Sequence, residues 1–250
     1  MRINKSGHEL RSVEDWFKYA SPKMGEHHWK DGRSAKELAQ SWFRNGTSKP
    51  PDELVELLEA KFAAGITFEE AKPECVVELD NFAGEHRNCD LVVLCNMGAK
   101  RTVITVEAKA DEPFGDVIGE YFDRKAGTGS KVPARIQQLS EAMFGRAPDG
   151  AIRKLRYQLL HAAAATLIEA KDSRAEMGIL LVHEFRSASL NTDKLTQNAT
   201  DWGNFVHAFP ELATARIEGN QILGPVSVPG GGHVPNCVPL YLGELITNLG

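Results

Sequence analysis

Two stretches in the first quarter of the chain repeat apolar residues at helical spacing, residues 34–44 and 52–65. The first begins with Ser34 three positions before Glu37, which is the spacing of a capping box. The second begins with Asp52, a residue type that often caps a helix through its side chain. The pattern therefore predicts two helices, each with a side-chain cap.

The pattern then changes to short runs of β-branched residues at 74–80, 90–95 and 102–110, separated by glycine and asparagine turn signals. These runs predict three strands that form an antiparallel meander. Residues 151–171 are rich in alanine and leucine and predict the longest helix of the chain. The continuous apolar run that follows, residues 177–185, is typical of a fully buried central strand.

The order of these elements predicts an α/β fold with a mixed central sheet, an antiparallel meander plus a further strand, flanked by helices. We expect a single domain that comprises a partly irregular N-terminal cap (1–33), the core (34–186) and a C-terminal extension packed on the core (187–250). Within the extension, residues 191–209 suggest a polar loop and a short helix. A linker rich in glycine and proline and a last strand at 239–246 complete the extension.

Composition and charge narrow the classes of function. The chain has 250 residues, is 42% hydrophobic and 25% charged, and contains no apolar run near the roughly 18 residues that a membrane helix needs. The N-terminus lacks the apolar region of a secretory signal, so we expect a cytoplasmic protein without a membrane partner. The four cysteines lack C-x-x-C spacing and are expected to be reduced. Nothing indicates a homo-oligomer, and the net charge of −5 means that any nucleic-acid binding must depend on local charge.

One strand carries charge where a buried strand would not need it. In residues 102–110, alternate side chains share a face, so Glu107 and Lys109 lie on the same side of the strand. If this strand and residues 90–95 form a hairpin about a turn near Gly98, Asp90 stands opposite Glu107, with the two Cβ atoms roughly 4.5–5.5 Å apart. The register therefore predicts two carboxylates that face each other, beside a lysine.

Two opposed carboxylates destabilise a strand pair unless a positive charge lies between them. Paired carboxylates are also a common way of holding Mg²⁺, which can activate water and withdraw charge from a phosphate, while a lysine stabilises developing negative charge. The alternative is a solvated ion pair between Glu107 and Lys109 worth under about 1 kcal/mol.

An aspartate on one strand followed by E-x-K on the next, flanked by helices, resembles the PD-(D/E)XK phosphodiesterase superfamily over residues 34–185. The matching residues are Asp90, Glu107 and Lys109; Cys89 stands where the proline of the motif would be. The resemblance implies a restriction-endonuclease-like core in which Asp90 and Glu107 hold Mg²⁺ or Mn²⁺ and Lys109 assists catalysis. It also implies a nuclease, with DNA or RNA as the partner.

A longer combination of segments is similar to an uncharacterised bacterial domain family of the same superfamily. These segments are HWKDGRSAKELAQSW, VEAKADEPFG, RYQLLHA and LLVHEF. This family supplies no substrate, and a shared fold does not guarantee activity. Two alternatives therefore remain open. One is a catalytically inactive nuclease-fold module that binds a partner in a defence or mobile-element system, and the other is a purely structural α/β protein.

Other residues are weaker candidates for the same site. A further helix acid could come from Glu37, Glu53 or Glu56, and Gln158 could reach the site, although the order of Tyr157 and Gln158 departs from the Q-x-x-x-Y pattern of many members. Asp111 and Glu112 could join a metal through water or fix the turn before a proline. A basic segment could clamp a phosphate backbone or be a solvated loop; its residues are Arg124, Lys125, Lys131 and Arg135.

The histidines give no zinc-site spacing. Those at 27, 28 and 233 are expected to be packing or hydrogen-bonding residues, and Cys237 adds no ligand pattern to the last of them. His161 and His183 lie in apolar segments, where a core histidine is the better interpretation than a general base.

Overall fold

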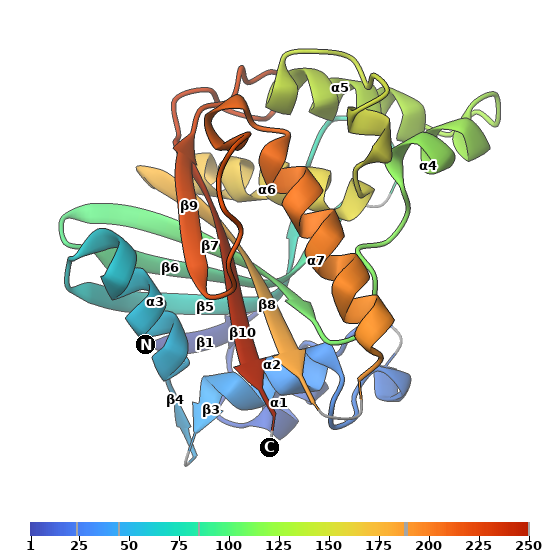
Figure 1. The fold of residues 1–250 in the computed structure, drawn as a ribbon. Helices are drawn as coiled ribbons and strands as arrows, with labels where there is room; N and C mark the ends of the chain where they lie inside the picture. The colour runs from blue at the N-terminus through green and yellow to red at the C-terminus, as the bar shows by residue number, and fades with distance from the viewer. Residues whose placement is uncertain (24, 45, 85, 188–189, 250) are drawn as a thin grey trace.

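The computed structural model describes residues 1–250 except 24, 45, 85, 188–189 and 250. Its described residues form a large sheet with helices on both faces, in the strand order β2-β1-β5-β6-β7-β8-β10-β9 (Figure 1). The strands of this sheet are β1 (Arg2–Lys5), β2 (His8–Glu9), β5 (Ile66–Val77), β6 (Arg87–Met97), β7 (Lys100–Lys109), β8 (Met177–Arg186), β9 (Gln221–Val226) and β10 (Leu240–Asn248). A separate two-stranded ribbon consists of β3 (Phe43–Arg44) and β4 (Thr47–Ser48).

The helices of the described chain lie in connections between these strands, and some connections contain more than one helix. They are α1 (Val13–Tyr19), η1 (Gly25–His27), α2 (Ser34–Trp42), α3 (Asp52–Phe62), α4 (Ile118–Lys125), α5 (Val132–Phe144), η2 (Ile152–Lys154), α6 (Tyr157–Asp172), α7 (Thr192–His207) and η3 (Pro210–Leu212). None of them, in the described part of the chain, combines the length and apolarity needed to cross a membrane.

The centre of the sheet agrees with the sequence-based expectation. Strands β5, β6 and β7 pair antiparallel in chain order, which confirms the meander. Strand β8 is parallel to β7 on one side and to β10 on the other, and nine of its ten residues are buried. An α/β fold with a mixed sheet between helices is therefore confirmed.

Each face of the sheet has its own core. Helices α4 to α7 cover one face, where Val103 of β7 packs with apolar residues of α6. Helices α1 to α3 cover the other face, where Ile104 and Val106 of β7 pack. Because both faces are covered, β7 is buried from its third residue to its end. Charged residues at the end of β7 are thus removed from water.

Both predicted side-chain caps are wrong. Ser34 is the first residue of α2 rather than its cap, and its hydroxyl donates to Glu112 Oε1 at 3.2 Å. Glu37 reaches back to the backbone N–H of Gly32 at 2.6 Å. Asp52 is the first residue of α3 and pairs with Lys49 at 2.7 Å. In each case a nearby polar partner takes the side chain that would have capped the helix.

The C-terminal part contains more regular structure than the sequence suggested. The segment expected to be a polar loop and a short helix is almost entirely the 16-residue helix α7, capped by Asn191, whose Oδ1 accepts from the N–H groups of Asp193 and Lys194. Its buried stripe includes Trp202 and Phe205, which are enough to fix the helix although most of its residues are polar. The predicted helix at 151–171 divides into η2 and α6, and α6 is no longer than α7.

The two ends of the chain also contribute to the sheet. Strand β1 pairs parallel with β5, so residues 1–33 contain regular elements and not only a cap. Strand β10 pairs with β8 along nine residues, from Leu240 to Asn248. The C-terminal segment therefore forms part of the central sheet.

Candidate active site

The register of the β6–β7 hairpin brings the predicted acids together. The first pair after the turn is Met97 with Lys100, and the last pair of the ladder is Leu91 with Val106. The turn between the strands has two residues, of which Gly98 is the first. Gly98 has a φ of 59°, which glycine adopts without strain and which type II′ hairpins require at this position. One further step of this register would put Asp90 opposite Glu107, the pair that the sequence predicted, but the ladder stops before it.

The two strands separate at this point. The β6–β7 ladder ends at Leu91, whereas β6 continues to pair with β5 as far as Arg87. The backbone N–H of Ala108, next to Glu107, instead donates to Asp90 Oδ2 at 2.8 Å. The Asp90 carboxylate therefore lies directly against β7 beside Glu107, on the face that α6 covers.

Glu107 is surrounded by cationic and amide donors. It is 1% exposed, and its carboxylate accepts from Lys109 Nζ at 2.8 Å, from Gln158 Nε2 of α6 at 2.6 Å, and from Arg87 of β6. Burial alone would raise the pKa of Glu107, but the charges of Arg87 and Lys109 outweigh burial and hold the pKa below its ordinary value. Glu107 is therefore an anion with both oxygens bonded.

Asp90 has the opposite character. Burial, and then the negative charge of Glu107, raise the pKa of Asp90 to about 7, although Lys109 and Arg87 act in the other direction. The pair is thus unequal, with one carboxylate neutralised by cations and one that lacks an ion-pair partner among the described residues. An additional cation beside Asp90 would favour its charged form.

Two residues at or near this site were not predicted from the sequence. Arg87, 9% exposed, lies three positions before Asp90 and reaches Glu107 across the separated strands. Glu74 lies between residues paired with Leu91 and Cys89, which places it opposite Asp90 on the other side of β6. Burial raises the pKa of Glu74 to about 7, and the Glu107 charge acts in the same direction. The register positions of the three acids therefore follow one another across adjacent strands, while the Glu74 side chain accepts from Asn88 Nδ2 and lines a different cavity.

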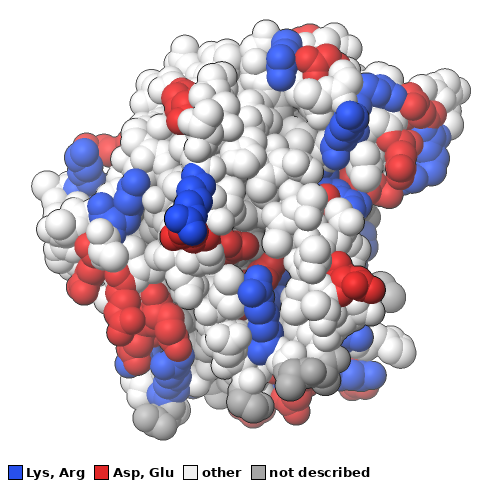
Figure 2. Space-filling view, viewed as in Figure 1, with Lys and Arg blue, Asp and Glu red and all other residues white. Residues whose placement is uncertain are grey.

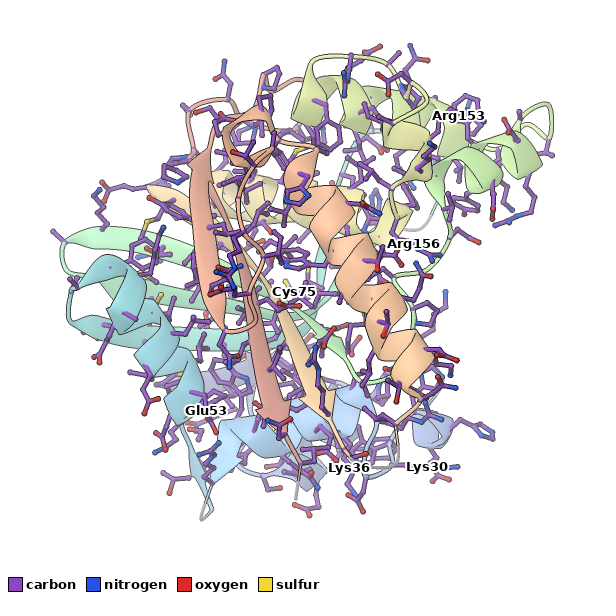
Figure 3. The ribbon with its side chains drawn as sticks, in the orientation of Figure 1. Lys30, Lys36, Glu53, Cys75, Arg153 and Arg156 are labelled. Carbon is purple, nitrogen blue, oxygen red and sulfur yellow. The ribbon has the colours of Figure 1, made fainter. Side chains whose placement is uncertain are left out.

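Of the other candidates from the sequence, one lies at this site and the helix acids lie elsewhere. Gln158 belongs to the site through Glu107. The helix acids do not: Glu37 binds a backbone N–H, Glu53 pairs with Arg44 at 3.0 Å, and Glu56 is exposed. Helix α3 packs on the face of the sheet opposite α6, and Figure 3 shows Glu53, at the start of α3, far from Arg156, at the start of α6.

The acids after Lys109 fix the turn that follows β7. Glu112 Oε2 accepts from the backbone N–H of Ala110 at 2.8 Å, and Asp111 pairs with Arg33 at 2.8 Å and with Lys194 at 3.2 Å. These contacts agree with the structural interpretation of both residues.

The histidines differ in their surroundings. His183 Nε2 lies 3.0 Å from the hydroxyl of Thr247, and burial lowers the pKa of His183 to about 3, as in a neutral core histidine. His161 of α6 borders the site, and burial together with the charges of Arg87 and Arg135 lowers its pKa well below the ordinary value. The surroundings of His161 are therefore positively charged.

Two cavities open beside residues that bond to Glu107, and the lining of neither includes Asp90 or Glu107. One, of about 360 Å³, is lined by Lys109 and Gln158, and the other, of about 470 Å³, is lined by Arg87 and by Lys125, Lys131 and Arg135 of the basic segment. The two share Tyr121, Tyr157 and His161 in their walls. The basic segment thus borders the candidate site.

The donor set fits a magnesium or manganese ion in part. The described residues contain no group of three or more His, Cys, Asp or Glu placed to hold a metal. Mg²⁺, however, is often bound by one or two carboxylates, with water and substrate phosphate as the other ligands. Asp90 and Glu107 supply two such groups. The fit requires Arg87 to release one oxygen of Glu107.

Comparison with known proteins adds a family but no activity. No curated protein and no solved structure matches the chain. A family model with the description "Domain of unknown function (DUF6946)" matches residues 9–248, which include the whole sheet from β5 to β10 and every residue of the candidate site. The chain therefore belongs to the DUF6946 family.

Proposed function

We propose that the protein is a phosphodiesterase dependent on Mg²⁺ or Mn²⁺ that acts on nucleic acid. The observation that carries this proposal is the placement of Asp90 beside Glu107 where β6 and β7 separate, with Lys109 bonded to Glu107 at 2.8 Å. The proposal includes a restriction-endonuclease-like core. The order of α3, three antiparallel strands, α6 and the parallel strand β8 supports that core.

In this proposal Asp90 and Glu107 are the metal ligands. A bound divalent ion would make a coordinated water more acidic and withdraw charge from a phosphate oxygen. Lys109 stabilises the negative charge that develops on the phosphate, and its position beside the smaller cavity agrees with this role. Gln158 positions Glu107 through its hydrogen bond of 2.6 Å.

Local charge supports a nucleic-acid substrate in a protein that is acidic overall. The visible face in Figure 2 carries acidic side chains over α3 and mixed charges near α4, without a broad basic patch. The cavity of about 470 Å³ differs from this surface, since none of the described residues that line it is an acid. Phosphate groups would therefore be attracted to this cavity rather than to the whole surface.

Cleavage assays test this proposal directly. We expect the full chain to cut single- or double-stranded DNA or RNA in Mn²⁺ or Mg²⁺ and not in EDTA. Lys109→Met should lower the cleavage rate by about 100-fold or more, in the range found when one group that stabilises transition-state charge is removed. The matched control is Lys171→Met, at an exposed position near the end of α6. If the parent protein shows no metal-stimulated cleavage of any of these substrates, the proposal fails.

A second candidate function is favoured by one specific contact. Arg87 bonds to Glu107 on the side where a metal would be held, and this contact supports a binding module that keeps the fold without the metal. The discriminating measurement is Mn²⁺ binding to the parent protein by electron paramagnetic resonance. Binding that is lost in Asp90→Asn supports the phosphodiesterase, and absence of binding supports the inactive module.

A further inference from the structure

We propose that the 470 Å³ cavity beside Arg87 binds a phosphate monoester dianion, namely the terminal phosphate of a nucleic-acid chain. The identification of the ligand as a chain end rests on the proposed function, whereas the phosphate chemistry rests on the cavity itself. The cavity is named the phosphate pocket below. Its charged and imidazole-bearing lining residues are His86, Arg87, Lys125, Lys131, Arg135 and His161.

The phosphate pocket has an excess of positive charge. Two of its cations are balanced by buried acids, since Arg87 pairs with Glu107 and Arg135 with Asp80 at 2.5 Å. The other two, Lys125 and Lys131, form no ion pair with a described acid. Two unbalanced positive charges match a phosphate monoester, which carries between 1.5 and 2 negative charges near pH 7, better than a phosphodiester with one.

One unused N–H donor, on Arg87, and two imidazole nitrogens without a partner point to the same ligand. Three buried nitrogens of the lining have no hydrogen-bond partner in the described structure: His86 Nδ1, Arg87 Nε and His161 Nδ1. Arg87 is 9% exposed, so its Nε lacks both a protein partner and free access to water. A buried N–H without a partner costs about 1–3 kcal/mol. A phosphate oxygen in the pocket would supply the missing acceptor.

The N-terminus of helix α5 adds partial positive charge to the wall of the pocket. The helix begins at Val132, a lining residue, and its N-cap Lys131 offers no side-chain cap. The first turn of a 13-residue helix therefore lies at the pocket wall, where its partial positive charge favours a phosphate.

The phosphate pocket adjoins the cavity that contains Lys109, so a bound chain end would extend toward the candidate site. The phosphate pocket and the smaller cavity that contains Lys109 share Tyr121, Tyr157 and His161. The two tyrosine rings have centroids 5.4 Å apart and offer apolar surface on which a base can stack. A chain end anchored by its phosphate near Lys131 would therefore place a neighbouring phosphodiester beside Lys109. The arrangement favours removal of nucleotides from an end over cutting within a chain.

Binding without metal tests the pocket independently of catalysis. The full chain is titrated in EDTA with a fluorescent single-stranded oligonucleotide that carries a 5′-phosphate, with one that carries a 3′-phosphate, and with the same oligonucleotide ending in hydroxyl groups. We expect one phosphorylated form to bind about tenfold more tightly than the hydroxyl form, because its terminal phosphate adds charge-assisted hydrogen bonds. The double variant Lys125→Gln/Lys131→Gln should lose this difference.

A matched control separates the pocket from general charge. Lys100→Gln/Lys171→Gln changes the net charge equally at exposed positions outside the pocket and should keep the tenfold difference. The proposal is overturned if the parent protein binds phosphorylated and hydroxyl ends equally, or if both double variants lose the difference to the same extent. Competition by a mononucleotide or by inorganic phosphate that matches the oligonucleotide would support the phosphate pocket and assign it to a small phosphoester.

The outcome also separates this inference from the proposed function. A phosphate-dependent difference without metal-stimulated cleavage keeps the pocket and removes the phosphodiesterase. Cleavage without any preference for phosphorylated ends keeps the phosphodiesterase and removes the pocket.

Discussion

Arg87 and Glu107 form a buried ion pair between β6 and β7, at side-chain exposures of 8% and 1%. Lys109 binds the other oxygen of the same carboxylate, so one anion lies between two cations. Neither cation has a second acidic partner among the described residues. Glu107 is therefore the charge on which the local fold depends, whatever reaction the site performs.

Replacement of Glu107 by glutamine should destabilise the protein strongly. Glu107→Gln leaves Arg87 and Lys109 buried without an anion, and breaking a buried ion pair in this way typically costs about 3–5 kcal/mol. Urea denaturation, followed by circular dichroism, measures the change in the free energy of unfolding. The control is Glu9→Gln, which removes an exposed pair with Arg11 and should cost less than about 1 kcal/mol. Equal losses in the two variants would show that the Glu107 contacts are not structural.

Removal of Arg87 should improve metal binding. In Arg87→Met, one oxygen of Glu107 loses its competing cation, and a charge-assisted contact worth about 1.5–3 kcal/mol no longer has to be broken. We expect Mn²⁺ to bind at least tenfold more tightly than to the parent protein, measured from the free Mn²⁺ signal in electron paramagnetic resonance. Arg124→Met, which removes an exposed pair with Asp116, should leave the affinity unchanged. An unchanged affinity in Arg87→Met would mean that Arg87 does not occupy the metal position.

The sequence was sufficient to bring Asp90 close to Glu107 for a specific reason. A two-residue turn containing Gly98 fixes the hairpin register, and alternation along β7 then fixes which side chains share a face. Both steps are local. The burial of Val103 and Ile104 against different helices confirms the assignment of the two faces.

Glu74 and Arg87 could not be placed in the same way. The register between β5 and β6 shifts between Phe68 and Glu70, and Glu74 itself has a φ of 51°. A bulge of this kind moves every later residue of β5 relative to β6, and no sequence signal marks its position. Arg87 was missed because it reaches Glu107 only where β6 separates from β7 beyond Leu91. This separation is a tertiary feature.

The error at α7 has a different cause. Most residues between Thr192 and His207 are polar, so the sequence pattern resembles a loop. The helix is fixed by a narrow buried stripe that includes Trp202 and Phe205 and by the ion pair of Asp201 with Arg156 at 2.7 Å. These contacts join α7 to the start of α6, and a scan for apolar periodicity detects only the stripe.

A second buried ion pair should contribute to stability in the same way. Asp80 and Arg135 join the segment after β5 to α5, at side-chain exposures of 2% and 7%. Asp80→Asn should lower the free energy of unfolding by about 3–5 kcal/mol, because the Arg135 charge loses its buried carboxylate. Asp116→Asn, at an exposed pair with Arg124, should change it by less than about 1 kcal/mol. Urea denaturation of both variants checks the contrast, which a small loss in Asp80→Asn would contradict.

A buried glutamate on β10 should make stability depend on pH. Burial and the neighbouring charge of Glu184 raise the pKa of Glu244 from 4.5 to about 7, while Arg186 acts in the other direction. Between these two pH values the folded chain holds a proton that the unfolded chain has lost, so stability falls as the pH rises and levels off above about 7. Glu244→Gln removes this contribution because glutamine does not ionise, whereas the contributions of Asp90 and Glu74, whose pKa values are also raised to about 7, remain in both proteins.

The expected gain from Glu244→Gln is therefore present only at higher pH. At pH 8 the variant should be more stable than the parent by about 1–3 kcal/mol, given about 1.4 kcal/mol for each pKa unit, and at pH 4 the advantage should vanish. Thermal and urea unfolding at the two pH values measure the difference. An advantage of the same size at pH 4 would show that packing, and not ionisation, is the cause.

The four cysteines should differ sharply in reactivity. All are free thiols, and only Cys237 is exposed. Burial raises the pKa of Cys89 and of Cys95 to about 12, and burial also raises the pKa of the half-buried Cys75, so these three are poor sources of thiolate. An aromatic disulfide reagent added to the native protein at pH 8 should thus modify one thiol in a fast phase, and Cys237→Ser should remove that phase. Unfolding in urea should release all four thiols in the parent protein. Fast modification of more than one thiol in the native protein would mean that β5 or β6, which carry the other three, opens at its edge more readily than its burial in the sheet implies.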